Sequence, residues 1–211
     1  MKKASLILLC ICITTITVWA QDEGEESEKG FKQENLFTGG SITLSFFNGQ
    51  TIIGANPVFG YQLAKWVDAG ISLNFLYNGS RDYYEFDDKI NQTVIGPGVF
   101  TRLYPVKFLF VQGQFEHNFN TLKYIPAPGS LRPEDKVKVD ANSLLLGGGF
   151  AQGRQPGSNS FFYFSVLVDV LKNVNSPYVN VDYDPVTGNQ RVTMVPIIRA
   201  GVNIGLFQGR Y

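Results

Sequence analysis

Histidine, cysteine and charge are scarce in this sequence of 211 residues. It has one His and two Cys, and 17% of its residues are charged, against roughly 25% in an ordinary soluble domain. One His excludes a multi-His metal site, and two Cys exclude a disulfide scaffold or a zinc ribbon. The formal net charge is zero, which excludes nucleic-acid binding driven by a basic surface.

Long apolar runs are also missing after residue 20, and no long segment repeats its apolar residues with a period of 3.6. The first absence excludes a membrane-spanning helix, and the second excludes a helical domain. Aromatic residues, by contrast, are abundant, with 17 Phe and 10 Tyr. Apolar and polar residues alternate with a period of two from residue 36 onward, which is the pattern of β-strands.

The first twenty residues have the pattern of a secretory signal peptide. Lys2 and Lys3 precede an apolar run over residues 6–18, and cleavage is expected after Ala20. Both cysteines lie before that position. Residues 21–35 are rich in acids and hold one aromatic, so they predict a flexible tail. The predicted domain organisation is therefore a signal peptide (1–20), an acidic tail (21–35) and a β-barrel (36–211).

Eight alternating segments predict eight strands. They cover residues 40–47, 51–61, 67–77, 93–104, 108–119, 140–151, 161–171 and 192–206. Pro57 and Pro97 lie inside two of them and lack the N–H of a strand ladder, so each predicts a bulge or a local gap in the pairing.

The composition of the two faces indicates what each face contacts. A soluble lipocalin-like carrier would hold its apolar face inside and expose a highly charged face to water. Here the polar faces are mostly Gly, Ser, Asn and Gln, and the apolar faces carry no acidic or basic residue except Asp140 at the end of a segment. A charge facing lipid costs roughly 2–4 kcal/mol for Lys or Arg at the midplane. The apolar faces are therefore predicted to contact lipid, in an all-β, eight-stranded, antiparallel, up-and-down transmembrane barrel.

The polar faces of the eight segments are predicted to form a polar core in the lumen. We expect it to consist of Asp68, Arg102, Gln112, Gln114, Glu116, Asp169, Arg199 and Asn203. Eight strands leave an interior just wide enough for side chains, so a filled lumen is expected, with a narrow pore as the alternative. Gly147 and Gly149 are expected to allow close packing there.

Three long connections, 78–92, 120–139 and 172–191, are expected on the extracellular side, because outer-membrane barrels have short periplasmic turns and long external loops. Their aromatic and basic residues are candidate contact residues for a surface protein or ligand. These are Tyr83, Tyr84, Tyr124, Arg132, Tyr178 and Tyr183. The turn at 184–189 separates two β-like stretches and predicts a hairpin that extends the seventh and eighth strands beyond the bilayer. Its edge is a candidate for strand addition by a partner.

Two segments resemble the small eight-stranded bacterial outer-membrane barrels, the family of OmpX-like and OmpA-like membrane domains. They are IGPGVFTRLYP at 95–105 and IIRAGVNIGLF at 197–207. The second resembles the terminal strand that the barrel-assembly machinery reads. The resemblance implies the outer membrane of a Gram-negative bacterium, contact with its lipid, and biogenesis through that machinery. It says little about activity, because this family spans adhesion, structural and enzymatic roles.

A structural or surface-interaction role through the external loops is the favoured function, with no cofactor. A lipid-modifying or proteolytic enzyme is the alternative, and it would depend on His117, which lies on the lipid-facing side of its strand without a Ser or Asp at 115 or 119. Acidic pairs such as Asp87-Asp88 do not match a calcium-binding loop.

Overall fold

The computed structural model describes residues 30–47, 50–82, 85–155, 158–183 and 189–208. The predicted signal peptide, most of the acidic tail, and the loop residues Tyr83 and Tyr84 lie outside these ranges. Gln33–Asn35 form a short 3-10 helix, η2, and the Lys32 N–H donates to the Tyr61 hydroxyl at 3.1 Å. Among the described residues, no helix is long and apolar enough to cross a membrane.

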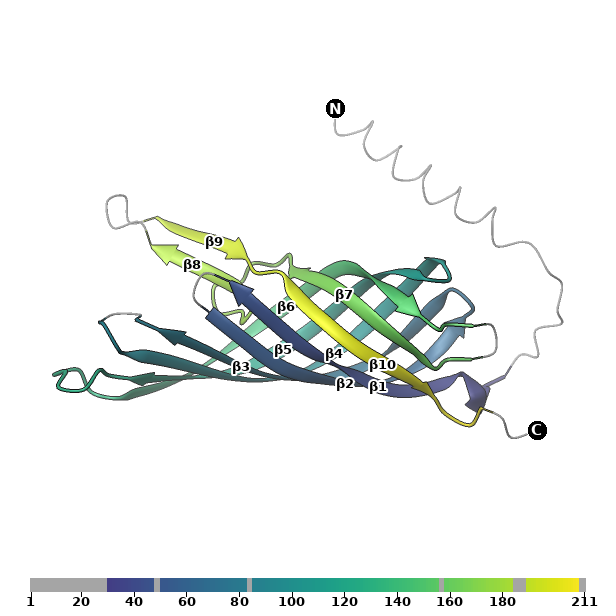
Figure 1. The fold of residues 1–211 in the computed structure, drawn as a ribbon, viewed down its shortest axis with the longest axis horizontal. Coiled ribbons are helices and arrows are strands. Elements are labelled where there is room, and N and C mark those ends of the chain that lie inside the picture. The colour runs from purple at the N-terminus through teal and green to yellow at the C-terminus, as the bar shows by residue number, and fades with distance from the viewer. Residues whose placement is uncertain (1–29, 48–49, 83–84, 156–157, 184–188, 209–211) are drawn as a thin grey trace, which may run out of the picture. The chain divides into compact units, whose positions relative to one another are not determined.

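Ten strands follow, and eight of them close a barrel (Figure 1). The barrel strands are β1 (Leu36–Phe47), β2 (Gln50–Ala64), β3 (Val67–Arg81), β4 (Lys89–Val106), β5 (Leu109–Ile125), β6 (Asp135–Gln152), β7 (Phe161–Asp169) and β10 (Ile197–Gly205). Each pairs antiparallel with its neighbours, in the order β1-β10-β7-β6-β5-β4-β3-β2. The prediction of an eight-stranded antiparallel barrel is confirmed.

One end of the barrel carries the start of β1 and the end of β10 and is called the terminal end below. The other end, the loop end, carries the β1–β2, β3–β4, β5–β6 and β7–β10 connections. The barrel wall has unequal height, because β2 to β6 have 15 to 18 residues whereas β7 and β10 have nine each. A membrane strand needs about 9–11 residues, so the long strands project beyond it.

The projecting part of the wall is longer than the sequence indicated. The segments 78–92 and 120–139 were expected to be loops, yet β3 continues to Arg81, β4 begins at Lys89, β5 continues to Ile125 and β6 begins at Asp135. Strand pairing with the neighbours continues these strands beyond the segments whose outward face is apolar. We call the projecting sheet the platform, formed by residues 78–81, 89–93, 120–125 and 135–140.

The predicted hairpin forms, but as a separate two-stranded sheet of β8 (Val179–Tyr183) and β9 (Gln190–Met194). It does not continue the seventh and eighth predicted strands without a break. Residues 170–178 lie between β7 and β8, and Val195-Pro196 separates β9 from β10. Pro196 has no N–H to donate, which fits this interruption of the ladder.

Both prolines within strands leave local gaps in the pairing, as predicted. The β2–β3 register passes from Ala55↔Phe75 to Val58↔Ser72, and Pro57 falls between these pairs. The Nδ2 of Asn56 donates to the carbonyl oxygen of Leu73, at 3.5 Å, where the proline offers no N–H. Pro97 lies in a similar gap on the β5 side of β4, between Ile95↔Phe119 and Gly98↔Glu116.

Candidate functional site

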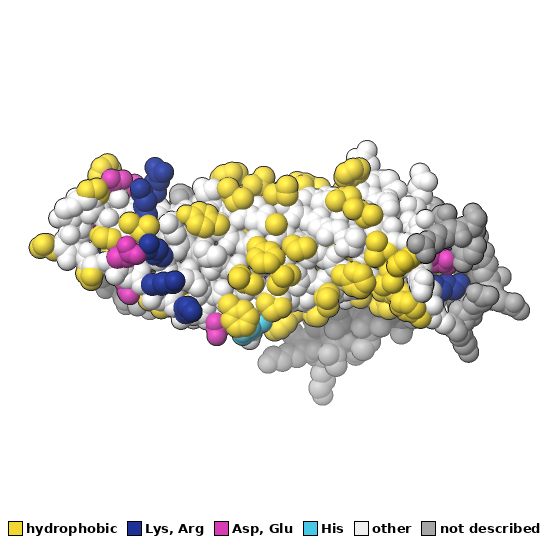
Figure 2. Space-filling model, turned by 90° about the horizontal axis from the view of Figure 1, so that it is seen from below, with side chains coloured by type: hydrophobic (Ala, Val, Ile, Leu, Met, Phe, Trp, Pro, Cys, Tyr) yellow, Lys and Arg dark blue, Asp and Glu magenta, His cyan; other side chains and the backbone are white. Residues whose placement is uncertain are grey.

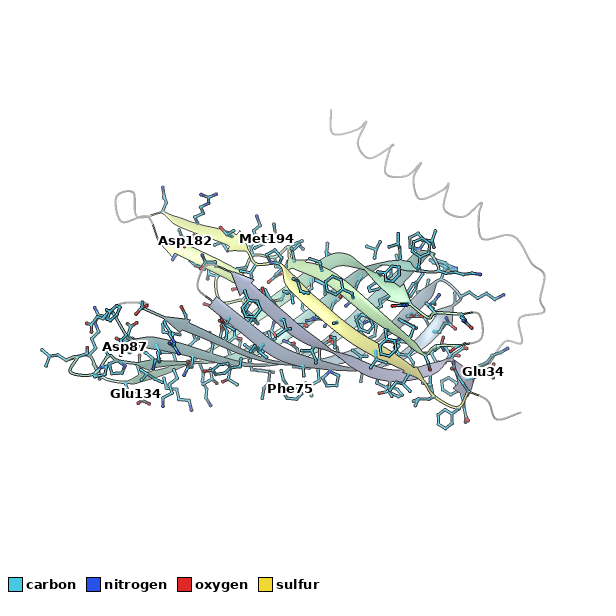
Figure 3. The ribbon with its side chains drawn as sticks, in the orientation of Figure 1. Glu34, Phe75, Asp87, Glu134, Asp182 and Met194 are labelled. Carbon is cyan, nitrogen blue, oxygen red and sulfur yellow. The ribbon has the colours of Figure 1, made fainter. Side chains whose placement is uncertain are left out.

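The outward face of the barrel is apolar. Side chains such as Phe75 point away from the wall with 42% of their surface exposed (Figure 3). A belt of hydrophobic side chains covers the wall on the face shown in Figure 2. Within the described strands, Asp140 is the one acidic residue on the outward face between the two borders of this belt. A soluble carrier would bury these side chains, so the lipocalin-like alternative is wrong, and the belt is the lipid-facing surface of a transmembrane barrel.

The lumen buries all eight residues expected in the polar core, with at most 3% of any of them exposed. Seven of them take part in hydrogen bonds between side chains or to the backbone. At the centre, Arg199 Nη2 lies 3.2 Å from Glu116 Oε1 and its Nη1 donates to Gln114 Oε1 at 2.9 Å. Gln114 Nε2 also donates to Glu116, at 2.7 Å, and Gln112 donates to Gln114 at 2.8 Å. This network neutralises the buried carboxylate, which would be costly without a partner.

Arg102 continues the network toward the terminal end. Its Nε donates to Gln112 at 2.9 Å and its Nη1 to Asn203 Oδ1 at 3.1 Å. Its guanidinium carbon lies 4.1 Å from the ring centroid of Tyr163 and 5.1 Å from that of Phe100. Aromatic faces attract a desolvated cation, so the rings help to hold this arginine, to which no carboxylate of the described residues is hydrogen-bonded.

Asp68 has a partner that strand parity does not predict. Arg154 comes from the connection between β6 and β7, and its side chain, 8% exposed, folds into the terminal end of the lumen. Its Nη2 lies 3.5 Å from Asp68 Oδ1, and its guanidinium carbon lies 3.8 Å from the Tyr104 ring centroid. Arg154 thus supplies the third buried cation beside the three buried acids of the lumen.

The loop end of the lumen is closed by the segment that follows β7. Tyr178 was expected to be an exposed contact residue, and this expectation is wrong: its side chain is 0% exposed. Its hydroxyl donates to Glu116 Oε2 at 2.6 Å and accepts from Asn74 Nδ2 at 2.7 Å. Ser176 donates to Asp169 Oδ2 at 2.6 Å and lies 3.0 Å from the Ser143 hydroxyl. Residues 176–178 are buried and form an inward-folded plug that anchors the β8–β9 hairpin, whereas Val170, Leu171 and Val174 before them are exposed.

Two apolar clusters bound the polar core. The cluster at the terminal end consists of Tyr104, Phe110, Ala151, Phe161 and Tyr163. The cluster at the loop end consists of Ile52, Leu76, Val94, Leu145, Leu167, Tyr178, Val195 and Ile197. Packed side chains at both ends favour a filled lumen over a pore, and they place any binding site outside the lumen.

His117 lies on the outward face, where its Nδ1 is 2.7 Å from Asn142 Oδ1 on the neighbouring strand. Its ring also packs against Phe119, with centroids 4.8 Å apart. An amide that orients a histidine is one part of a nucleophilic site. Within the described residues, however, no hydrogen bond joins His117 to a hydroxyl. The pair therefore provides an oriented base without a nucleophile.

A cleft opens at the loop end between the platform and the hairpin. Figure 3 shows Asp87 and Glu134 on the platform side and Asp182 and Met194 on the hairpin side. One cavity of about 180 Å³ lies at the base of the cleft, between Ile90, Leu122 and Val139 of the platform and Val179 and Val181 of β8. A second cavity of about 530 Å³ shares Ile90 and Leu122 and extends along the platform. Polar side chains such as Asn78, Gln92 and Asn180 also line the smaller cavity, whereas the larger one is mainly apolar.

Two of the expected contact residues, Tyr124 and Arg132, line the larger cavity. Partial burial of its ring raises the pKa of the Tyr124 hydroxyl above its ordinary value, and the nearby Asp88 carboxylate raises it further. Arg132 Nε lies 3.1 Å from Glu85 Oε1. Tyr183 is in β8, where its backbone pairs with Gln190.

An unpaired strand edge borders the cleft, which sequence reasoning missed. β6 pairs with β7 only from Leu145 to Gln152, whereas its pairing with β5 runs on to Asp135. The Leu144 carbonyl of β6 accepts from the Val170 N–H at 2.9 Å. The backbone N–H and C=O groups of the even-numbered β6 residues therefore point away from β5. The N–H and C=O groups of Lys136 and Lys138 therefore point to the side without a strand, where the Lys136 N–H donates to Asp135 Oδ1 of its own strand at 2.7 Å.

Comparison with known proteins gives weak similarity. One similar structure is that of Ail, the attachment invasion locus protein of Yersinia pestis, in complex with the heparin analogue sucrose octasulfate. It is 9% identical to this chain with a TM-score of 0.44, and the match covers 80% of this chain and 95% of Ail. Its backbone structure in a phospholipid bilayer nanodisc has 12% identity and a TM-score of 0.35, over 80% and 98%. No protein-family model and no curated protein sequence matches this chain. The fold assignment therefore rests on the strand order and registers given above.

Proposed function

We propose that this chain is a surface-interaction protein in the outer membrane of a Gram-negative bacterium, and that its loop end faces the exterior. A closed barrel with a lipid-facing belt supports this location, and the projection of β3 to β6 at the loop end supports this orientation. We propose that residues 1–20 direct secretion, that residues 21–35 form a tail, and that β10 is read by the barrel-assembly machinery. The filled lumen and the missing nucleophile beside His117 favour interaction over transport or catalysis.

The unpaired edge of β6 is the observation that carries the proposed interaction. Unpaired N–H and C=O groups bind an extended chain by strand addition, and apolar pockets beside such an edge select its side chains. We propose that a segment of an extracellular protein adds to β6 along residues 135–140. Its apolar side chains would then contact Leu122, Val137 and Val139 inside the cleft.

The test uses the whole protein in nanodiscs and a fluorescent synthetic peptide of alternating valine and threonine. Lys136→Pro removes an edge-facing N–H without touching the β5 ladder, and Lys136→Gln is its control for charge. Leu122→Glu places a charge inside the cleft, and Thr121→Glu places the same charge on the outward face. Lys136→Pro and Leu122→Glu should each weaken binding at least about tenfold, the equivalent of 1.4 kcal/mol, whereas the two controls should not.

Amide hydrogen exchange locates the bound peptide. Binding should slow the exchange of the Lys138 amide, which gains a hydrogen-bond acceptor. It should also slow the exchange of the Lys136 amide, which would exchange the Asp135 carboxylate for a carbonyl oxygen of the added strand. A peptide N-methylated on alternate residues should not bind. Peptide binding that leaves both amides unprotected, or that is insensitive to Lys136→Pro and to Leu122→Glu, would refute strand addition at this edge.

A further inference from the structure

A band of basic side chains crosses the outward face of the platform, next to the apolar belt (Figure 2). It consists of Arg81, Lys89, Lys123, Lys136 and Lys138. They come from four adjacent strands, β3 to β6, and share the outward parity of the lipid-facing residues. Arg81, Lys136 and Lys138 are exposed, and the other two are half-buried.

The strand register places like charges directly opposite each other in this band. Arg81 pairs with Lys89 across β3 and β4, and Lys123 pairs with Lys136 across β5 and β6. Such pairs are destabilising unless an anion lies between them. Lys123 Nζ has Glu134 at 2.8 Å. Within the described residues, no ion pair joins the other four side chains to an acid.

The band lies at the depth where lipid headgroups meet the barrel. Along β3, the outward position Tyr77 is four residues from Arg81, and along β5, Phe119 is four residues from Lys123; both are about half exposed in the belt. Four residues of a tilted strand span roughly 10 Å along the barrel axis. At the opposite border, two short turns of the described chain each carry a lysine, Lys65 and Lys107.

We infer that this band binds the phosphate groups of lipids in the outer leaflet, with the acyl chains of the same lipids on the belt below. A phosphate monoester carries up to two negative charges and three acceptor oxygens, which matches a pair of opposed cations. The proximity of the belt favours a lipid over a free anion, because one molecule then satisfies both surfaces. The inference depends on the proposed orientation in the membrane, and it does not depend on strand addition at β6.

The test compares nanodiscs of phosphatidylcholine alone with nanodiscs that also contain phosphatidic acid, a lipid with a phosphate monoester. The variant Lys89→Gln/Lys138→Gln removes two cations of the band, and Lys65→Gln/Lys107→Gln removes two at the other border. Phosphatidic acid should raise the thermal midpoint of the wild type and of the control, and the band variant should lose most of that rise. In phosphatidylcholine alone, the band variant should be at least as stable as the wild type, because repulsion is relieved.

Three results would overturn the inference. The band variant would keep the full rise if the lysines did not bind the lipid. The control would lose the rise as well if any surface charge sufficed. Inorganic phosphate would raise the midpoint in phosphatidylcholine as much as phosphatidic acid does if the site took a free anion. None of these results would change peptide binding to β6, so the two proposals fail separately.

Discussion

Glu116 has 0% of its surface exposed and accepts hydrogen bonds from three side chains, those of Gln114, Arg199 and Tyr178. Strand parity in the sequence is enough to put Glu116 and Arg199 on the inner face. Their pairing depends on the register and on the tilt around the barrel, neither of which is encoded locally. Tyr178 and Arg154 enter the lumen from connections, where no alternation marks an inward direction.

The ion pair in the lumen gives a prediction at this scale. Arg199→Met keeps most of the side-chain volume but leaves Glu116 as a buried charge without its cation. We expect the free energy of unfolding to fall by about 3–5 kcal/mol. Urea unfolding in lipid vesicles, followed by the fluorescence of Trp66, measures this change.

The double variant Glu116→Gln/Arg199→Met separates charge from packing. Removing both partners leaves no uncompensated charge, so a large part of the lost stability should return. If the loss of stability in the double variant equalled the sum of the losses in Glu116→Gln and in Arg199→Met, the pair would contribute through packing alone.

At the scale of elements, alternation predicts a strand only where one of its faces is buried in lipid. The central parts of β3 to β6 meet this condition. Their loop-end parts have another pattern: Asn91 and Gln92 put polar residues on both faces of β4, and β6 turns Lys136 outward and Val137 inward. Pairing with the neighbouring strands extends these parts. The separate β8–β9 sheet was predictable from its turn, whereas the plug that anchors it was not.

Close contact between β6 and β7 gives a second prediction. A Cβ on Gly147 would collide with the carbonyl oxygen of Val166 and the Cα of Leu167 on β7. Gly147→Ala should therefore destabilise the barrel by about 1–3 kcal/mol and lower the yield of heat-resistant protein on a gel. Gly113→Ala is the matched control, because a Cβ there meets only the side chain of Leu146, at 3.5 Å. Equal losses in both variants would show that close strand contact is not the cause.

The molecule as a whole has an inverted arrangement of polarity. Charged side chains such as Arg102, Glu116 and Arg199 are enclosed, while large apolar side chains such as Phe75, Phe119 and Phe162 are exposed. Water disfavours this arrangement and a bilayer favours it, because lipid solvates the apolar belt. A closed barrel can cross the bilayer because its strands pair their backbone groups with one another. Composition and parity in the sequence were enough to predict this inversion, because they depend on residue type alone.

The most direct test measures which face of β4 contacts lipid. Single cysteines at Val94, Ile95, Val99 and Phe100 would carry spin labels in nanodiscs, and collision with oxygen, which partitions into lipid, would be compared with collision with a water-soluble nickel complex. Labels at Ile95 and Val99 should collide mainly with oxygen, and labels at Val94 and Phe100 with neither reagent, in a period of two. The reverse pattern, or a protein that stays monomeric in water without detergent, would contradict the account.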